Sequence, residues 1–256
     1  MIKLSVCFEM VFTEVPFLDR IAKVSEIGLS AFEFWGWGSK DINEIKGRKQ
    51  KHGLEIAAFG VDPRVNIVDR GTTDSFVRAV EDSVRIAHEL GCKTLIATTG
   101  NELKDVPRGQ QHENIVKCLK GAATTVQREK VTLVLEPLNI LVDHKGYYLS
   151  SSSEGFDIVR EVGSPNVKLL YDVYHQQITE GNLISTIARN IDMIGHFHAA
   201  DVPGRHEPGT GEINYANVLK AISDAGYEGY VGLELKPTKD SRQALKPIID
   251  IAESIQ

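Results

Sequence analysis

Residues 195–214 read GHFHAADVPGRHEPGTGEIN, and in this stretch a short apolar strand gives way to a long polar loop. The strand, predicted over residues 193–199, carries histidines inside an otherwise apolar run. The loop is rich in Pro, Gly, Arg and His, which is too turn-rich for a helix or a strand. A helical period resumes at Asn214. Polar groups at the carboxyl end of a buried strand, followed by such a loop, are typical of active sites in α/β enzymes.

The rest of the chain repeats this order of short apolar runs and longer amphipathic ones. We expect strands at residues 3–7, 31–35, 54–59, 94–98, 132–136, 167–172, 193–199 and 230–235. We expect helices at residues 16–27, 41–52, 73–90, 112–127, 154–162, 183–192, 215–225 and 242–255. Most of these strands are continuously apolar, which indicates burial on both faces and a parallel sheet.

Eight strand–helix units in 256 residues predict a (β/α)8 TIM barrel, a single domain over residues 1–256. The alternative fold is an open, doubly wound sheet. It is less favoured because no glycine-rich phosphate motif follows the first strand, where Phe8, Glu9 and Met10 stand instead.

The composition excludes several classes of function. The formal net charge of -6 argues against a general electrostatic attraction to nucleic acid or to an anionic membrane. The three cysteines, Cys7, Cys92 and Cys118, are widely spaced and odd in number, which favours reduced thiols in a cytoplasmic protein. No signal-peptide layout and no membrane-length apolar run is present. We therefore expect a cytoplasmic protein that acts on a small molecule, and the sequence leaves a homo-oligomer open.

Four consecutive predicted strands end in residues that can bind a metal. They deliver Glu136, Asp172, a histidine of the His196–His198 segment, and Glu234 to what would be one rim of the barrel. Three buried carboxylates would repel one another, and a divalent cation is the natural compensation. Oxygen-rich ligation with one imidazole and no thiolate favours Mn²⁺ or Mg²⁺, allows Co²⁺ and disfavours structural Zn²⁺.

Each of these residues taken alone has a simpler interpretation. A single glutamate at a strand end is usually solvated or paired with a cation, and Lys236 or Arg205 could serve. A single histidine is usually a hydrogen-bonded core residue. The metal site is predicted by the set, because perturbed ionisable groups cluster at functional sites.

Three segments resemble the hydroxypyruvate isomerase family of the xylose-isomerase-like TIM barrels, which has the ketose 3-epimerases as relatives. They are residues 135–139 (LEPLN), residues 171–175 (YDVYH) and residues 200–214 of the loop quoted above. Residues 12–20 are similar to the start of the family as well. The resemblance extends over nearly the whole chain.

The resemblance implies roles for individual residues. The metal ligands of the family fall on Glu136, Asp172, His198 and Glu234, its two acid/base carboxylates on Glu136 and Glu234, and its substrate contacts on His175 and Arg205. Two positions depart from the pattern. His198 matches the epimerases, whereas hydroxypyruvate isomerases often carry Gln there; the epimerases' additional acidic residue is replaced here by Leu141 and Val142.

The implied activity is a metal-dependent isomerisation of a small hydroxy-keto acid through an enediolate. The substrate would be of the hydroxypyruvate or tartronate semialdehyde type, or a four-carbon oxo-acid. The alternative is a ketose 3-epimerase of the tagatose or psicose type. An apurinic endonuclease-like phosphodiesterase and an inosose-type dehydratase are less favoured, and the former would need more histidine ligands and a basic face.

Two of the implied contacts and the loop lead to further expectations. Arg205 offers a bidentate fork for a substrate carboxylate, or else pairs with Glu207 or Asp201 within its loop. His175 hydrogen-bonds a substrate oxygen, or else supports the metal ligands. The sequence leaves open whether the loop at residues 203–211 closes over the site, which would exclude water and protect an enediolate.

Overall fold

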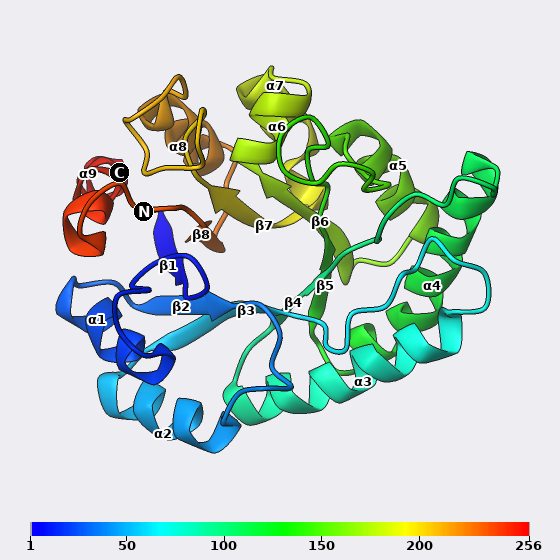
Figure 1. The fold of residues 1–256 in the computed structure, drawn as a ribbon, viewed down its shortest axis with the longest axis horizontal. Helices are drawn as coiled ribbons and strands as arrows, with labels where there is room; N and C mark the ends of the chain where they lie inside the picture. Colours follow the sequence, from blue (N-terminus) through cyan, green and yellow to red (C-terminus); the bar gives the residue numbers. More distant parts are fainter. Residues whose placement is uncertain (1, 256) are drawn as a thin grey trace.

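Eight parallel strands close into a barrel in the computed structural model, which describes residues 2–255 (Figure 1). The strands follow one another around the barrel in chain order, and β8 pairs with β1. They are β1 (Lys3–Cys7), β2 (Ala31–Phe34), β3 (Glu55–Gly60), β4 (Thr94–Ala97), β5 (Thr132–Leu135), β6 (Val167–Asp172), β7 (Ile194–Ala199) and β8 (Tyr230–Leu233). The predicted (β/α)8 TIM barrel is confirmed.

Helices surround the barrel on the outside (Figure 1). They are α1 (Arg20–Glu26), α2 (Ile42–His52), α3 (Thr73–Leu90), α4 (Arg108–Arg128), α5 (Ser152–Val162), α6 (Val173–Thr179), α7 (Leu183–Asn190), α8 (Tyr215–Asp224) and α9 (Ser241–Ser254), with short 3₁₀ turns η1 (Phe17–Asp19) and η2 (Ile191–Met193). Helix α3 buries one apolar stripe against the barrel, as its sequence period predicts. None of the helices in residues 2–255 is long and apolar enough to cross a membrane.

Several helices differ from the sequence-based expectation. The helix expected at residues 16–27 is the 3₁₀ turn η1 followed by α1, and α5 begins two residues earlier than predicted. Helix α4 begins at Arg108 rather than at residue 112, directly after Pro107, whose missing N–H costs nothing at a helix start. The short helix α6 was not predicted, because its seven residues carry no long apolar period. Its first residue follows Asp172, the last residue of β6.

Strands β5 and β8 end one and two residues earlier than predicted, so Glu136 and Glu234 directly follow the strands. The Glu136 N–H still donates to the Ala97 carbonyl at 3.0 Å, and the Glu234 N–H donates to the Ala199 carbonyl at 3.3 Å. Pro137 has no N–H and ends the ladder after Glu136. Both glutamates therefore stand at the carboxyl-terminal rim, where TIM barrels carry their chemistry.

Alternation along the strands decides which side chains enter the barrel, because successive residues of a strand face opposite sides. On β7, His196 and His198 point inward. On β2, Glu33 points inward, while Phe32 and Phe34 point toward the surrounding helices. The phenylalanines form the apolar layer between strands and helices; Phe34, for example, packs edge-on against a ring of η1 at 6.1 Å. The interior next to β2 and β7 is thus polar.

Candidate metal and catalytic site

The structure brings together the four residues predicted to bind a metal. Glu136, Asp172, His198 and Glu234 each offer one ligand atom, and these atoms all lie within 4.8 Å of one another. His198 Nδ1 lies 3.1 Å from a Glu234 oxygen, 3.2 Å from a Glu136 oxygen and 4.0 Å from Asp172 Oδ2. All four side chains are buried. Three acidic groups therefore surround one imidazole nitrogen.

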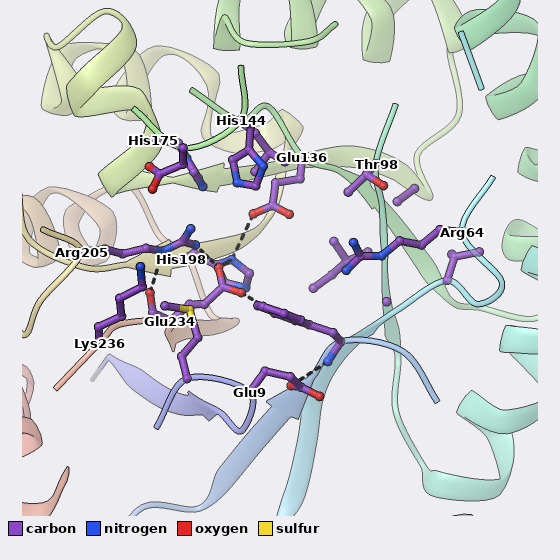
Figure 2. A pocket seen from close by; sticks show the side chains of 18 of the residues that line it. Glu9, Arg64, Thr98, Glu136, His144, His175, His198, Arg205, Glu234 and Lys236 are labelled. Atoms are coloured by element: carbon purple, nitrogen blue, oxygen red, sulfur yellow. Dashed lines mark hydrogen bonds and ion pairs between the residues drawn. The ribbon is translucent and has the colours of Figure 1, made fainter. Parts of the chain in front are cut away.

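A cavity of about 710 Å³ lies over these ligand atoms. Glu136, His198 and Glu234 line it, as do both residues expected to contact substrate, His175 and Arg205. Its other walls include Trp35, Arg64, His144, Leu138, Lys236 and Pro237. Arg205 and Arg64 extend into the cavity from opposite sides (Figure 2). A cavity of this size is ample for a small organic substrate.

One carboxylate oxygen of Asp172 caps helix α6, and the other faces the site. Its Oδ1 accepts the N–H groups of Tyr174 at 2.8 Å and His175 at 3.2 Å, which caps helix α6. Its Oδ2 lies 3.3 Å from Arg205 Nη2. The turn from β6 into α6 therefore sets the direction of this carboxylate. Burial raises the pKa of Asp172 above its ordinary value, although Arg205 and His198 act in the opposite direction.

Glu234 is held from three sides. The indole N–H of Trp35 donates to Glu234 Oε1 at 2.6 Å, and the Cys7 thiol lies 3.6 Å from the same oxygen. Arg205 Nη2 pairs with Oε2. Burial raises the pKa of Glu234, but Arg205 and His198 together lower it well below its ordinary value. The carboxylate is thus ionised at neutral pH.

His175 is a neutral hydrogen-bond donor with a free N–H. Its Nδ1 accepts the backbone N–H of Asn139 at 3.2 Å, so the ring proton is on Nε2. This Nε2 is buried and has no hydrogen-bond partner within residues 2–255. Burial, followed by the charge of Arg205, lowers the pKa of His175 to about 3. An uncharged imidazole therefore lines the cavity with its Nε2 3.6 Å from Asp172 Oδ2, and Asn139 of the LEPLN segment sets its orientation.

The polar loop after β7 is anchored by one buried carboxylate. Asp201 accepts four backbone N–H groups of its own loop, from Val202, Gly209, Gly211 and Ile213, at 2.8 to 3.1 Å. Asp201 is fully buried. The loop is thereby folded back on the strand end, and this places Arg205 at the cavity.

Arg205 pairs with neither of the loop acids considered from the sequence. Asp201 is committed to backbone N–H groups, and Glu207 accepts the N–H and hydroxyl of Thr238 at 2.9 and 2.6 Å. The guanidinium instead contacts Asp172 and Glu234. Sequence spacing favours partners close in the chain, whereas these two stand at the carboxyl ends of two other strands, β6 and β8.

Glu33 is a residue of this region that sequence reasoning did not identify. It lies inside the barrel below His198, 1% exposed, with one oxygen 3.1 Å from His198 Nε2 and the other 2.8 Å from His196 Nε2. Burial raises the pKa of Glu33, but His198 and His196 outweigh it and bring the pKa to about 2. The available signal was its place in strand 31–35, where a charged residue interrupts an aromatic run.

The donor set fits a divalent metal. Glu136, Asp172 and Glu234 converge on one point, where the guanidinium of Arg205 supplies a compensating charge. Burial lowers the pKa of the His198 imidazole, but Glu234 and Glu33 outweigh it and raise that pKa well above its ordinary value, so the ring adds positive charge when no ion is bound. Three carboxylates and one imidazole form the oxygen-rich set that suits a hard or borderline ion. The site is therefore compatible with one divalent cation.

Comparison with known proteins identifies the family. The sequence model of the family described as xylose isomerase-like TIM barrel matches residues 21–251. Hydroxypyruvate isomerase of Escherichia coli K12 is 32% identical over 253 residues, which cover 96% of this chain and 98% of that protein. The chain belongs to the hydroxypyruvate isomerase family. The 2-oxo-tetronate isomerase of Cupriavidus necator is also 32% identical, over 89% of this chain and 90% of that protein. The expected enzyme class, an isomerase, is confirmed.

Solved structures agree with this placement in the xylose isomerase-like barrels. A structure from Brucella melitensis, titled as an AP endonuclease of family 2, has a TM-score of 0.92 and 28% identity, covering 98% of this chain and 99% of that one. D-psicose 3-epimerase from Clostridium cellulolyticum H10 has a TM-score of 0.84 and 20% identity, covering 99% of both chains. The epimerase likeness establishes the shared fold alone.

The loop anchored by Asp201 leads to a prediction about stability. Asp201→Asn replaces one of two oxygens, each of which accepts two N–H groups, with an NH₂ group that can only donate. We expect the free energy of unfolding to fall by about 1–3 kcal/mol, the cost of leaving buried donors unpaired. Amide hydrogen exchange in residues 202–213 should accelerate at the same time. Urea denaturation and exchange mass spectrometry measure the two effects.

The matched control is Glu212→Gln, because Glu212 is exposed and its side chain contacts only Gln177, at 3.1 Å, among the described residues. It should leave both measurements unchanged. Exchange in residues 202–213 that is the same in Asp201→Asn as in wild type would show that this carboxylate does not anchor the loop.

Proposed function

We propose that this protein is a metal-dependent isomerase that interconverts a small hydroxy-keto acid and its isomer through an enediolate. The substrate would be of the hydroxypyruvate or tartronate semialdehyde type, or a four-carbon oxo-acid. The observation that carries the proposal is the convergence of Glu136 and Glu234 with Asp172 and His198 beneath one cavity. The names of the two sequence relatives support the substrate class.

Mn²⁺ or Mg²⁺ is the proposed cofactor, with Co²⁺ as a further option. Glu136, Asp172, His198 and Glu234 would hold the ion. When bound, it would stabilise the negative charge that develops on the substrate oxygens as the carbon beside the carbonyl loses its proton.

Glu136 and Glu234 are the proposed acid/base groups. One of them removes the proton from the hydroxyl-bearing carbon beside the carbonyl, and the electron pair of that C–H bond forms the C=C bond of the enediolate while the π pair of the carbonyl moves to its oxygen. The hydroxyl proton then passes to that oxygen, and the same or the other glutamate returns a proton to the former carbonyl carbon as the new C=O bond forms. The contacts of Glu234 with Trp35 and Arg205 keep its carboxylate ionised and fixed in direction. Both groups lie at the floor of the cavity, where a bound carbon chain would be within reach.

His175 and Arg205 are the proposed substrate contacts. The unused Nε2–H of His175 can donate to a substrate oxygen without adding charge. Arg205 lines the cavity beside Asp172 and Glu234, so it would contact oxygens at the reacting end of the substrate.

A substrate carboxylate requires a cation that is not already committed. Arg205 is paired with two acids. Arg64 and Lys236 also line the cavity, and neither forms an ion pair within residues 2–255. Arg64 lies across the cavity from Arg205, with its guanidinium 5.9 Å from the Trp35 ring (Figure 2). We therefore place the carboxylate nearer to Arg64, whose planar fork suits it better than an ammonium group.

A ketose 3-epimerase is the second candidate function. Two observations favour it: a histidine stands at position 198, as in the epimerases, and the cavity of about 710 Å³ could accommodate a sugar. The same pair of glutamates would then move a proton at a single carbon. A panel of hydroxypyruvate, a four-carbon oxo-acid, tagatose and psicose, followed by proton NMR in D₂O, separates the two functions.

The first test concerns the two glutamates. Glu136→Gln or Glu234→Gln keeps the size of the side chain and removes the proton acceptor. We expect solvent deuterium incorporation into substrate to fall by about 10²–10⁴-fold, the usual contribution of a positioned acid/base group. Proton NMR of the Mg²⁺-reconstituted variants in D₂O measures it, and the metal content is determined in parallel to separate loss of the base from loss of the ion. Deuterium incorporation at the wild-type rate in either variant would refute the two-carboxylate mechanism.

The second test concerns the substrate carboxylate. Arg64→Gln should raise KM for acid substrates about 10–100-fold, the value of one hydrogen bond to a charged group, and leave any neutral ketose that is turned over unaffected. Lys236→Gln is the matched variant on the other wall and should have the smaller effect. Arg205→Gln should impair both substrate classes, because it removes a partner of Glu234. A loss confined to acids in Arg205→Gln alone would place the carboxylate at Arg205 instead.

A further inference from the structure

A second group of ionisable side chains lies inside the barrel, directly below the metal ligands. Glu33, His196 and His198 offer ligand-type atoms within 4.8 Å of one another, and all three are buried. Glu33 and His196 do not line the cavity. A carboxylate in this position is costly to desolvate, so its contacts should explain what it does.

His198 connects this interior group to the proposed metal centre, because its two ring nitrogens face in different directions. Its Nδ1 faces Glu136, Asp172 and Glu234, while its Nε2 lies 3.1 Å from Glu33 Oε1. A neutral imidazole carries one proton, and a nitrogen that binds a metal must be unprotonated. If Nδ1 binds the ion, the proton is on Nε2 and needs an acceptor.

Glu33 Oε1 is the acceptor that the structure provides. Within residues 2–255, neither His198 Nε2 nor Glu33 Oε1 has an aligned hydrogen-bond partner. The two atoms are nevertheless 3.1 Å apart, which is within hydrogen-bonding distance. His198 Nε2 thus needs an acceptor and Glu33 Oε1 needs a donor, and each atom can be the partner of the other.

The surroundings hold Glu33 in this orientation. Its other oxygen, Oε2, accepts the Ser5 hydroxyl at 3.0 Å and contacts His196 Nε2 at 2.8 Å. Gly232 of β8 leaves the necessary room, because a Cβ atom there would lie 2.1 Å from Glu33 Oε1. Three strands other than β2 therefore contribute to directing one carboxylate oxygen at His198.

We propose that Glu33 is the positioning residue of the metal centre: it accepts the Nε2–H of His198 and so fixes the ring with Nδ1 turned toward the three metal-binding carboxylates. The inference rests on the proposed metal centre. It assigns Glu33 no contact with substrate. Partners of this kind hold a ligand histidine in one tautomer and one orientation, and their loss weakens metal binding.

The test measures metal binding and ring protonation, without turnover. Calorimetric titration of Mn²⁺ into apo wild-type protein should give one ion per chain. Glu33→Gln replaces the carboxylate with a weaker acceptor and should weaken Mn²⁺ binding about 10–100-fold, with an unchanged circular dichroism spectrum.

Two control variants distinguish a Glu33 that positions His198 from a Glu33 that merely fills the barrel interior. Ser5→Ala and His196→Gln each remove one of the two partners of Glu33 Oε2 and leave Oε1 opposite His198, so each should weaken Mn²⁺ binding clearly less than Glu33→Gln does. If Glu33 merely fills the interior and holds His196, then His196→Gln will weaken Mn²⁺ binding as much as Glu33→Gln does, and the proposal fails.

Nitrogen NMR of the Mg²⁺-loaded wild-type protein provides a measurement that needs no variant. It should show His198 with a protonated Nε2 and an unprotonated Nδ1. A proton on Nδ1, or a second ion held by Glu33, His196 and His198, would overturn the assignment. Failure of the wild-type protein to bind any Mn²⁺ would refute the metal centre itself, whereas one bound ion with equal affinity in Glu33→Gln would refute only the role of Glu33.

Discussion

Negative charge buried at one point of the barrel rim is the constraint on which the rest of the site depends. Glu136, Asp172 and Glu234 face a single imidazole nitrogen, and all three side chains are buried. Uncompensated burial of even one carboxylate costs several kcal/mol, so such a group persists only where cations and hydrogen bonds surround it. Arg205 supplies one positive charge, and the loop that carries it is held in place by a further buried acid, Asp201. The polar loop is thus part of the same electrostatic arrangement.

The fold and the location of this arrangement follow from the sequence because both depend on short-range pattern. Continuous apolar runs between amphipathic helices allow few folds other than a parallel barrel, and the carboxyl ends of its strands meet at one rim. Glu136, Asp172 and Glu234 each stand at the end of such a run. Their convergence needed no knowledge of side-chain geometry. The exact ends of the strands could not be predicted in this way. Strand β8 stops at Leu233, where the chain turns toward the loop that carries Arg205.

The partners of these residues could not be predicted, because they lie far apart in the chain. Arg205 pairs with acids 29 and 33 residues away, on other strands, in preference to acids of its own loop. Glu33 lies 163 residues from His196, and its inward direction depends on the parity of β2 relative to β7. A one-residue change of register would turn Glu33 outward among the helices. Helix α6 was missed for a related reason: its start depends on the Asp172 cap rather than on any apolar period.

Several site residues divide their polar atoms between the fold and the cavity. Asp172 caps helix α6 with Oδ1 and leaves Oδ2 to the site. His175 accepts a hydrogen bond from Asn139 with Nδ1 and leaves Nε2–H free. Side chains anchored in this way lose little conformational freedom when a ligand arrives, because folding has already restricted them. The negative charge of the three carboxylates is what mainly remains to be compensated at the site. The ligands of a divalent cation would already be oriented, and the bound cation would reduce the repulsion between them. The site and the barrel are therefore not independent, since the bond that directs Asp172 also caps helix α6, and the bond that directs His175 also holds the segment that follows β5.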